Sequence, residues 1–83
     1  MTNNVLTREL TLLRIRFEEH PDNFFCITFD LGVYHWFKIE SDGMLIFDHS
    51  YSTRTGSTKS SYSQGQKVKA SLNRKGVKMS HFL

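Results

Sequence analysis

Residues 51–83 of this 83-residue chain lack aspartate and glutamate, because no carboxylate side chain follows Asp48. Residues 1–50 carry eight acidic residues and four cations, about −4, whereas residues 51–83 carry +7. A segment that is cationic and free of carboxylates attracts polyanions and offers hydrogen-bond donors to phosphates. We therefore predict a nucleic-acid partner, against the alternative of a solvated basic tail. The cations concerned are Arg54, Lys59, Lys67, Lys69, Arg74, Lys75 and Lys78.

Cysteine is nearly absent, and no long apolar run is present. A single cysteine, Cys26, excludes an internal disulfide. No Cys-x-x-Cys occurs, and no pair among His20, His35, His49 and His81 has metal-ligand spacing, so we expect neither a metal nor another cofactor. No stretch approaches about 18 consecutive apolar residues, which argues against a membrane partner. The N-terminus has no basic flank before an apolar run, and we expect a cytoplasmic protein.

Motifs of catalysis are also missing. Gly56 and Gly65 stand alone, so there is no Gly-rich phosphate loop. Serines and histidines are plentiful, but no sequence feature orders them for nucleophilic catalysis. The sequence therefore favours a binding protein over an enzyme.

Hydrophobic residues make up 39% of the chain and lie mostly between Leu10 and Phe47, which suits one small domain covering residues 1–83. Three runs in this region are predicted to be antiparallel strands, because alternate residues are apolar and turn residues separate the runs. They are residues 24–30, 33–39 and 44–48. We predict an α+β fold: an antiparallel β-meander of three to four strands with a C-terminal helix packed on one face.

The N-terminal segment has two interpretations. A helix over residues 4–17, capped by Asn3 or Asn4, would place an apolar residue every three to four positions on one face. A strand over residues 10–18 would alternate as a half-buried strand does. The following His20-Pro21-Asp22-Asn23 favours the strand, because it predicts a hairpin with Pro21 at the first central position of a type I turn.

The carboxylate-free half is predicted to contain a loop and then a helix. Residues 49–65 are mostly Ser, Thr, Gly and Tyr with scattered cations, which predicts a flexible basic loop. Residues 66–75 predict a helix, because Gly76 follows where a left-handed cap belongs and Val77 could then touch Leu72. A hairpin whose turn lies just before Gly76 is the alternative. The final hydrophobic residues are expected to dock on the core.

Aromatic residues suggest how RNA would bind. Alternation places Tyr34, Trp36 and Lys38 on the outward face of strand 33–39, and His35 on its inward face as a hydrogen-bonded core residue. Rings on a sheet beside a basic loop suit the stacking of unpaired RNA bases. The alternative is that the C-terminal helix covers these rings as ordinary core. We predict one RNA-binding surface made of the seven cations and four rings: Tyr34, Trp36, Tyr51 and Tyr62.

With a helix at its start, the element order becomes α-β-β-β-α, which resembles the double-stranded-RNA-binding domain. Gly32-Val33-Tyr34-His35, the Asp42-Gly43 hairpin and Lys67 to Gly76 also resemble, in order, the HicA mRNA interferase toxins. That resemblance implies an endoribonuclease with His35 as the catalytic residue. It departs from the HicA pattern in two places. Val33-Tyr34 separates Gly32 from His35, and Phe47-Asp48-His49 stands where Pro-x-His is usual.

In size and basicity the chain is also similar in type, without a shared residue motif, to small accessory proteins of tailed phages, among them toxin inhibitors that act through RNA, such as TifA. The sequence thus leads to an RNA-binding protein, in the role of an inhibitor of a host defence toxin. The alternatives are a HicA-like endoribonuclease toxin and a module that docks to a host protein, such as a toxin or nuclease. An exposed edge strand would also allow a homo-oligomer.

Overall fold

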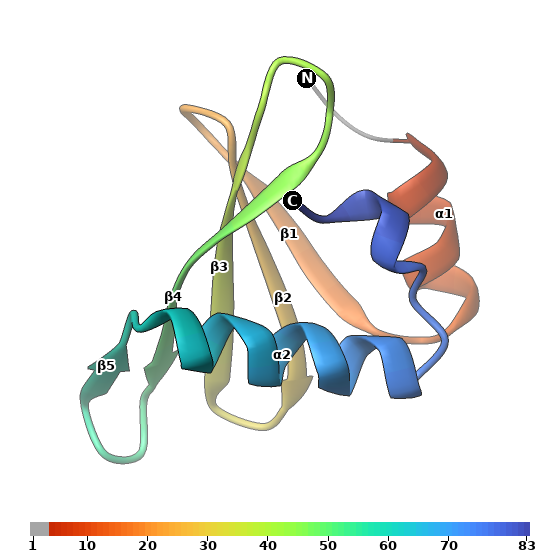
Figure 1. The fold of residues 1–83 in the computed structure, drawn as a ribbon. Helices are drawn as coiled ribbons and strands as arrows, with labels where there is room; N and C mark the ends of the chain where they lie inside the picture. Colours follow the sequence, from red (N-terminus) through yellow and green to blue (C-terminus); the bar gives the residue numbers. More distant parts are fainter. Residues whose placement is uncertain (1–3) are drawn as a thin grey trace.

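Residues 4–83 are described by the computed structural model, which contains an antiparallel sheet with both helices on one of its faces (Figure 1). The elements are α1 (Asn4–Leu12), β1 (Arg16–His20), β2 (Phe24–Asp30), β3 (Val33–Ile39), β4 (Leu45–Ser52), β5 (Ser57–Lys59), α2 (Tyr62–Arg74) and the short 3-10 helix η1 (Met79–His81). The five strands pair in sequence order. The α+β meander with a C-terminal helix on one face is confirmed, with five strands rather than three or four.

The hydrophobic core fills the space between the sheet and the helices. Alternate residues of the central strands point to this side, including Phe25 and Ile27 of β2 and Phe37 and Ile39 of β3. Buried residues of both helices and of the C-terminal segment complete it: Leu6, Leu10, Val68, Leu72, Val77 and Phe82. Because strand residues alternate in direction, the intervening residues lie on the opposite sheet face, which neither helix covers. We call this the open face.

The N-terminal segment is both a helix and a strand. Leu6 and Leu10 are buried on one side of α1, as the helical interpretation predicted, whereas the preferred strand over residues 10–18 is wrong for residues 10–15. The helix ends because Arg14 adopts a left-handed conformation, φ 59°, and the next amide, of Ile15, donates to the Leu10 carbonyl at 2.9 Å. The cap expected at Asn3 lies outside the described residues, and Asn4 is already helical.

The first hairpin uses a different turn from the one predicted. Asp22 and Asn23 both have positive φ, 63° and 62°, and the Phe24 amide donates to the Pro21 carbonyl at 3.4 Å. These are the features of a type I′ turn centred on Asp22 and Asn23, whose twist matches that of paired strands. Pro21 therefore precedes the central pair of the turn, and the predicted type I turn is wrong.

Residues 49–65 are ordered into strands and a helix start, which corrects the prediction of a loop. β4 continues to Ser52, and a turn containing Gly56, φ 68°, leads into β5. Ser61 then caps α2, because its hydroxyl accepts from the Gln64 amide at 3.1 Å. The polar composition of this segment fits a hairpin at the edge of the sheet, where every residue of β5 is exposed.

The helix predicted near the C-terminus is confirmed over the hairpin alternative. Gly76, φ 107°, donates to the Asn73 carbonyl at 3.0 Å, and Val77 donates to the Leu72 carbonyl at 3.0 Å. This is a Schellman motif, and it is accompanied by the buried hydrophobic pair Leu72 and Val77 that is common in such helix ends. Beyond it, Phe82 docks on the core beside β4, whereas the side chain of Leu83 is exposed.

Candidate nucleic-acid interface

The rings of β3 lie on the open face. The core side of β3 is occupied by His35, Phe37 and Ile39, so the alternate residues Tyr34 and Trp36 point away from α2. Both rings are partly exposed rather than buried. The alternative that the C-terminal helix covers them is therefore wrong.

Trp36 is the centre of an aromatic group that crosses four strands. The His20 imidazole of β1 lies 4.6 Å from the Trp36 ring, centre to centre, and the Phe24 ring of β2 meets it edge-on at 6.5 Å. On the other side, His49 of β4 is stacked on Trp36 at 6.0 Å. Tyr51 of β4 lies directly opposite Tyr34 of β3. We call these rings the aromatic platform: His20, Phe24, Tyr34, Trp36, His49 and Tyr51.

A β-bulge in β4 determines that His49 belongs to the platform. Trp36 pairs with His49 and Phe37 pairs with Phe47, so Asp48 is an extra residue on β4. Without the bulge, simple alternation from the inward Phe47 would point His49 into the core. The Asp48 carboxylate is also hydrogen-bonded to His49 Nδ1 at 2.5 Å, which fixes the imidazole orientation.

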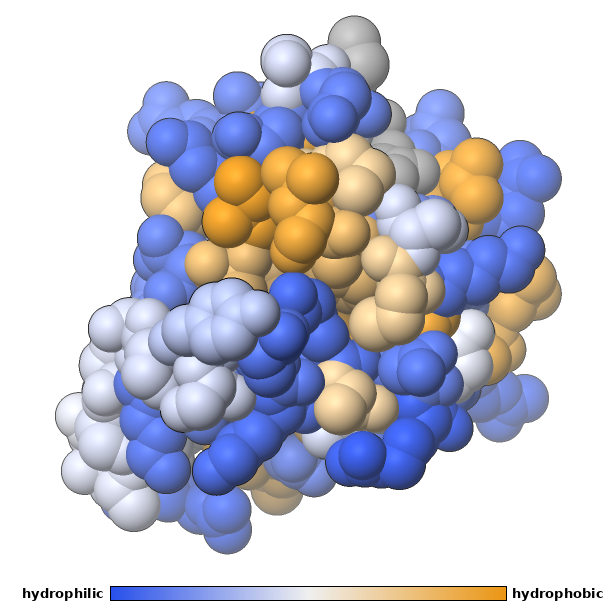
Figure 2. Space-filling view, viewed as in Figure 1, coloured by the Kyte–Doolittle hydropathy of each residue, from blue (hydrophilic) through white to orange (hydrophobic). Residues whose placement is uncertain are grey.

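The predicted cations do not form one surface with these rings. α2 buries Val68 and Leu72 against the sheet, so Lys67 and Arg74 are exposed on its outer side, away from the aromatic platform. Figure 2 shows strongly hydrophilic side chains gathered over α2. Lys69 donates to the Leu83 carbonyl at 3.2 Å. The expectation of a single coherent face is therefore wrong.

The remaining predicted residues lie at the margins. Lys59 is opposite Ser50 in the β4–β5 pair, on the helix side of the sheet edge. Lys78 is exposed where the chain leaves α2. Tyr62, in the first turn of α2, is 81% exposed and accepts a hydrogen bond from Gln66 Nε2. None of these three residues belongs to the aromatic platform.

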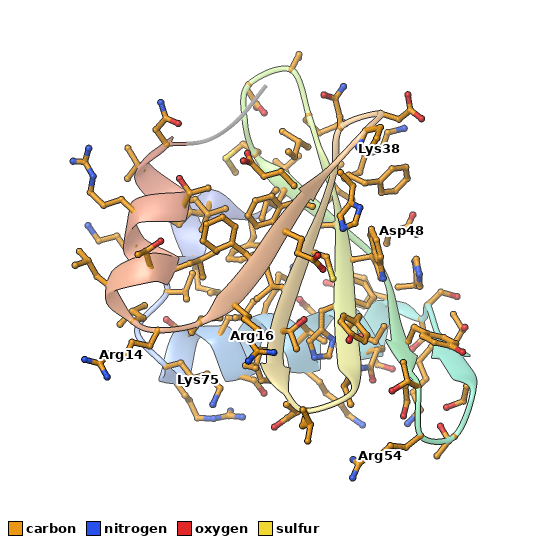
Figure 3. All side chains as sticks on the ribbon, turned by 180° about the vertical axis from the view of Figure 1, so that it is seen from behind. Arg14, Arg16, Lys38, Asp48, Arg54 and Lys75 are labelled. Carbon is orange, nitrogen blue, oxygen red and sulfur yellow. The ribbon has the colours of Figure 1, made fainter. Side chains whose placement is uncertain are left out.

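A different group of cations gathers at one end of the sheet. Arg14, Arg16, Arg54 and Lys75 lie toward one end of the molecule, and Lys38 lies at the other (Figure 3). We call Arg14, Arg16, Arg54 and Lys75 the basic end. It is assembled from both halves of the sequence, and the acidic first half supplies the two arginines that the sequence analysis did not include.

Two contacts hold the basic end together. The amide and the hydroxyl of Thr53 both donate to the Gly32 carbonyl, at 2.8 Å and 2.9 Å, so the β4–β5 turn with Arg54 lies against the β2–β3 turn. Lys75 Nζ lies 5.2 Å from the centre of the Phe29 ring, within range of a cation–π contact. These contacts position the turn that carries Arg54 and the side chain of Lys75.

Direct ion pairing does not neutralise the lysines and arginines. Within residues 4–83, the ion pairs closer than 4.0 Å are all made by histidines: His20 with Glu18, His49 with Asp48 and His81 with Glu9. The cationic side chains of this part of the chain therefore remain available to an anionic ligand.

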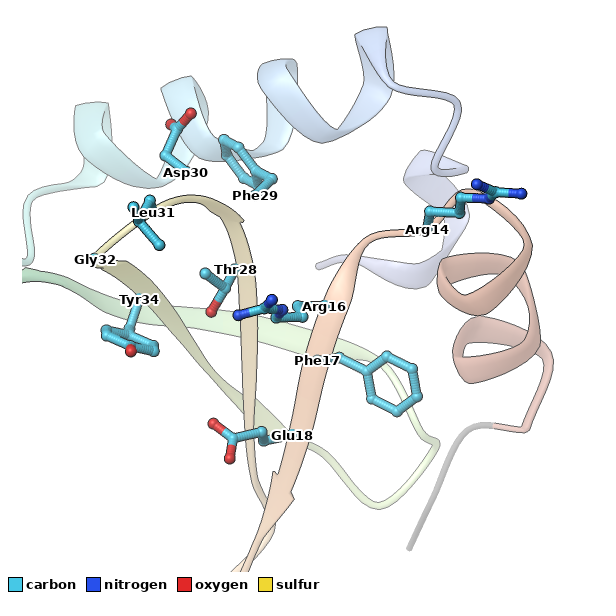
Figure 4. Close-up of a pocket in the computed structure, with 10 residues that line it drawn as sticks. All are labelled: Arg14, Arg16, Phe17, Glu18, Thr28, Phe29, Asp30, Leu31, Gly32 and Tyr34. Carbon is cyan, nitrogen blue, oxygen red and sulfur yellow. The ribbon is translucent and has the colours of Figure 1, made fainter.

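A half-open hollow of about 620 Å³ joins the basic end to the platform (Figure 4). Arg16 and Glu18 point from β1 across β2 toward the side where Tyr34 lies, whereas Arg14 points away. Asp30, beside the β2–β3 turn, contributes a second carboxylate to the lining. The lining thus combines two arginines, two carboxylates and three aromatic rings.

His35 is a core residue, as the alternation predicted. It is 4% exposed, its Nδ1 is hydrogen-bonded to the Ser50 hydroxyl at 2.7 Å, and its ring is stacked on Phe29. Burial lowers the pKa of His35, and the negative charge of Asp30 offsets only part of this effect. Because its imidazole faces the helix side and is enclosed, the geometry offers no contact between His35 and a strand on the open face.

Several residues of the interface were missed by the sequence analysis. Alternation along β1 could have placed Arg16 and His20 on one face, but a helix competed for the same segment. Nothing in the sequence indicated the bulge that turns His49 outward.

Cys26 lies beneath the platform and is 1% exposed, and burial raises the pKa of its thiol to about 11, which makes it a poor nucleophile.

Comparison with models of known protein families gives no match, and none of the curated proteins or solved structures compared is similar to the chain at a significant level. Within residues 4–83, no helix is long and apolar enough to cross a membrane. The same residues include no group of three or more His, Cys, Asp or Glu side chains that could hold a metal ion.

Proposed function

We propose that this protein binds single-stranded RNA on its open face. Bases stack on the aromatic platform, and the backbone runs toward the basic end, where Arg16, Arg54 and Lys75 contact phosphates. Stacking on exposed rings contributes about 1–3 kcal/mol per base and tolerates any sequence. Each phosphate contact adds affinity that falls as salt rises.

The observation that carries the proposal is the aromatic platform itself. Trp36 has ring neighbours from β1, β2 and β4, and strand alternation places all of them on the sheet face that the helices leave uncovered. Sheets that present rings to solvent beside cations are a recurring way of holding unpaired bases. A duplex hides the faces of its bases, which favours single-stranded over double-stranded RNA as the ligand.

The experiment is fluorescence anisotropy with a labelled single-stranded RNA and three variants of the protein. Tyr34→Ala with Tyr51→Ala removes two rings and is expected to weaken binding at least tenfold, since about 1.4 kcal/mol corresponds to a factor of ten. A variant that combines Arg16→Ala, Arg54→Ala and Lys75→Ala should depend less on salt. The negative slope of log affinity against log salt is expected to become shallower by about 2. Circular dichroism would establish that each variant is folded.

A matched control distinguishes the open face from general basicity. Lys67→Ala with Arg74→Ala removes two cations from the outer side of α2, away from the rings. We expect this variant to bind within about twofold of the wild type in buffer of moderate salt, because long-range attraction is then screened. If it loses as much affinity as the ring variant, the binding surface is on α2. If no variant and no wild type binds RNA, the proposal fails.

The similarity in type to small phage accessory proteins extends the proposal to one biological role, inhibition of a host defence toxin through bound RNA. Co-expression with such a toxin tests this role. Protection should disappear in the Tyr34→Ala, Tyr51→Ala variant if it depends on RNA. Protection that persists, together with capture of the toxin after nuclease treatment, would instead support docking to a host protein.

A further inference from the structure

We propose that the hollow at the basic end binds one nucleotide of the RNA strand and prefers a base that carries an exocyclic amino group. Cytosine is then favoured over uracil. This inference rests on the proposed function, because it identifies the base preference of the same surface.

The size and position of the hollow suit a single nucleotide. Its volume of about 620 Å³ lies in the usual range of small-ligand sites, about 300–1,000 Å³. It opens beside Tyr34, so a strand stacked on the platform would extend directly into it (Figure 4). A nucleotide there would have a ring to stack on and a guanidinium, that of Arg16, within the same lining.

A second bulge shapes this site. Ile27 pairs with His35 and Asp30 pairs with Val33, so Thr28 and Phe29 together face the single residue Tyr34. A bulge bends its strand and leaves the extra residue unpaired. The hollow lies at this irregularity, with Thr28 and Phe29 in its lining.

The carboxylate of Glu18 gives the hollow its chemical preference. It projects on the same side as Arg16 and Tyr34, and the only ion-pair contact recorded for it within residues 4–83 is with His20 Nε2 at 3.9 Å. An ionised carboxylate accepts hydrogen bonds and donates none. It therefore pairs with the amino group at position 4 of cytosine and repels the keto oxygen of uracil at the same position.

A carboxylate would otherwise be out of place in an RNA-binding surface, because it repels phosphates. Glu18 and Asp30 are nevertheless the residues that interrupt the cations around the hollow. A carboxylate is suited to this position if it contacts an RNA base rather than the phosphates of the RNA backbone. Arg16 neutralises the nearby phosphate while Glu18 pairs with the base.

The test compares two RNA octamers of one base each, oligo(C) and oligo(U), by anisotropy with the full-length protein. These pyrimidines are similar in size, so their difference isolates the group at position 4. The wild type is expected to bind oligo(C) about tenfold more tightly, the size of one charge-assisted hydrogen bond. Glu18→Gln should reduce this ratio to about twofold or less, because an amide donates as well as accepts.

Glu40→Gln is the matched control. It removes the same charge from the β3–β4 turn, outside the residues that line the hollow, and should leave the oligo(C) to oligo(U) ratio unchanged. Equal affinity of the wild type for both octamers, or a ratio that survives Glu18→Gln, overturns the inference and leaves RNA binding intact. Absence of binding to either octamer overturns the proposed function itself.

Discussion

The indole of Trp36 and the imidazole of His49 lie parallel across β3 and β4, with 6.0 Å between ring centres and 7° between ring planes. This relationship exists because the bulge at Asp48 reverses the direction of the residue that follows it. Bulges are frequent beside functional sites, where they redirect a side chain. The stacked pair therefore links a local irregularity of the backbone to the surface on which we place RNA.

Replacing Gly65 by alanine is expected to destabilise the protein, although alanine is the better helix former. A Cβ at this position would lie 2.8 Å from Phe47 Cδ2, closer than side chains pack. Overpacking of this kind costs about 1–3 kcal/mol, against a gain of about 1 kcal/mol in helix propensity. Urea unfolding should show a net loss of up to about 2 kcal/mol.

Two comparisons separate packing from propensity in that experiment. Asn73→Ala, at an exposed position of the same helix, should stabilise slightly because nothing opposes its propensity. Adding Phe47→Leu to Gly65→Ala should recover part of the loss by making room for the methyl group. A Gly65→Ala variant as stable as the wild type would mean that α2 does not pack closely on β4.

Arg14→Gly is expected to stabilise the fold by about 1 kcal/mol, because a left-handed conformation is strained for any residue with a Cβ. Arg14 has φ 59° at the end of α1, where glycine is the usual residue. Arg14→Ala is the control and should bring no such gain, since alanine retains the Cβ. Equal stability of the glycine and alanine variants in urea would contradict this interpretation.

The contact between α1 and the C-terminal segment should make stability depend on pH in the acid range. Burial alone would raise the pKa of Glu9, but the Lys78 amide donates to its Oε1 at 2.7 Å and His81 contacts its Oε2 at 3.2 Å. The net effect lowers the pKa below its ordinary value of 4.5. The unfolded chain therefore takes up the proton first as pH falls, and the stabilisation is lost progressively below about pH 4.5.

Urea unfolding of the wild type and Glu9→Gln between pH 6 and pH 3 checks this prediction. The wild type should be more stable by about 1–2 kcal/mol at the upper end, the value of a charge-assisted hydrogen bond. The difference should shrink toward the lower end. A difference that stays constant over the whole range would show that the Glu9 carboxylate is not what holds the segment.

His35 should produce a second pH dependence, in a higher range. Its pKa is lowered by burial from the ordinary 6.5, so the unfolded chain binds its proton more readily than the folded protein does. Stability is fully present above about pH 6.5 and falls as pH drops toward the folded pKa. Unfolding of the wild type and His35→Gln at pH 7.5 and 5.5 should show a larger loss in the wild type. An equal loss in both would contradict the assignment.

The features of the fold that depend on regular strand alternation and on local helix caps could be predicted from the sequence. The inward face of β2 and β3, the outward rings Tyr34 and Trp36, and the helix end at Gly76 followed from periodicity and from one glycine. The end of α1 did not, because Arg14 occupies the left-handed position where a glycine would have marked it. The edge hairpin could not be predicted, because the short exposed strand β5 has no apolar side to distinguish it from a loop.

The candidate site could be predicted only in part, because regular alternation does not describe all of its residues. Side-chain direction on a regular strand can be derived from the sequence, but the two bulges that turn His49 outward and open the hollow beside Tyr34 cannot. The charge split separates seven of the eleven lysines and arginines from every carboxylate side chain along the chain. It could not show that α2 carries Lys67 and Arg74 to the side opposite the rings, because that depends on which sheet face the helix covers.

The most direct test of the account uses the fluorescence of Trp36, the single tryptophan of the chain and the centre of the aromatic platform. Titration with single-stranded oligo(C) RNA at low salt should quench its emission to a plateau, and added salt should reverse the quenching as phosphate contacts are lost. RNA binding seen by anisotropy with unchanged Trp36 emission, or no binding at all, would contradict the claim that the open face holds the strand.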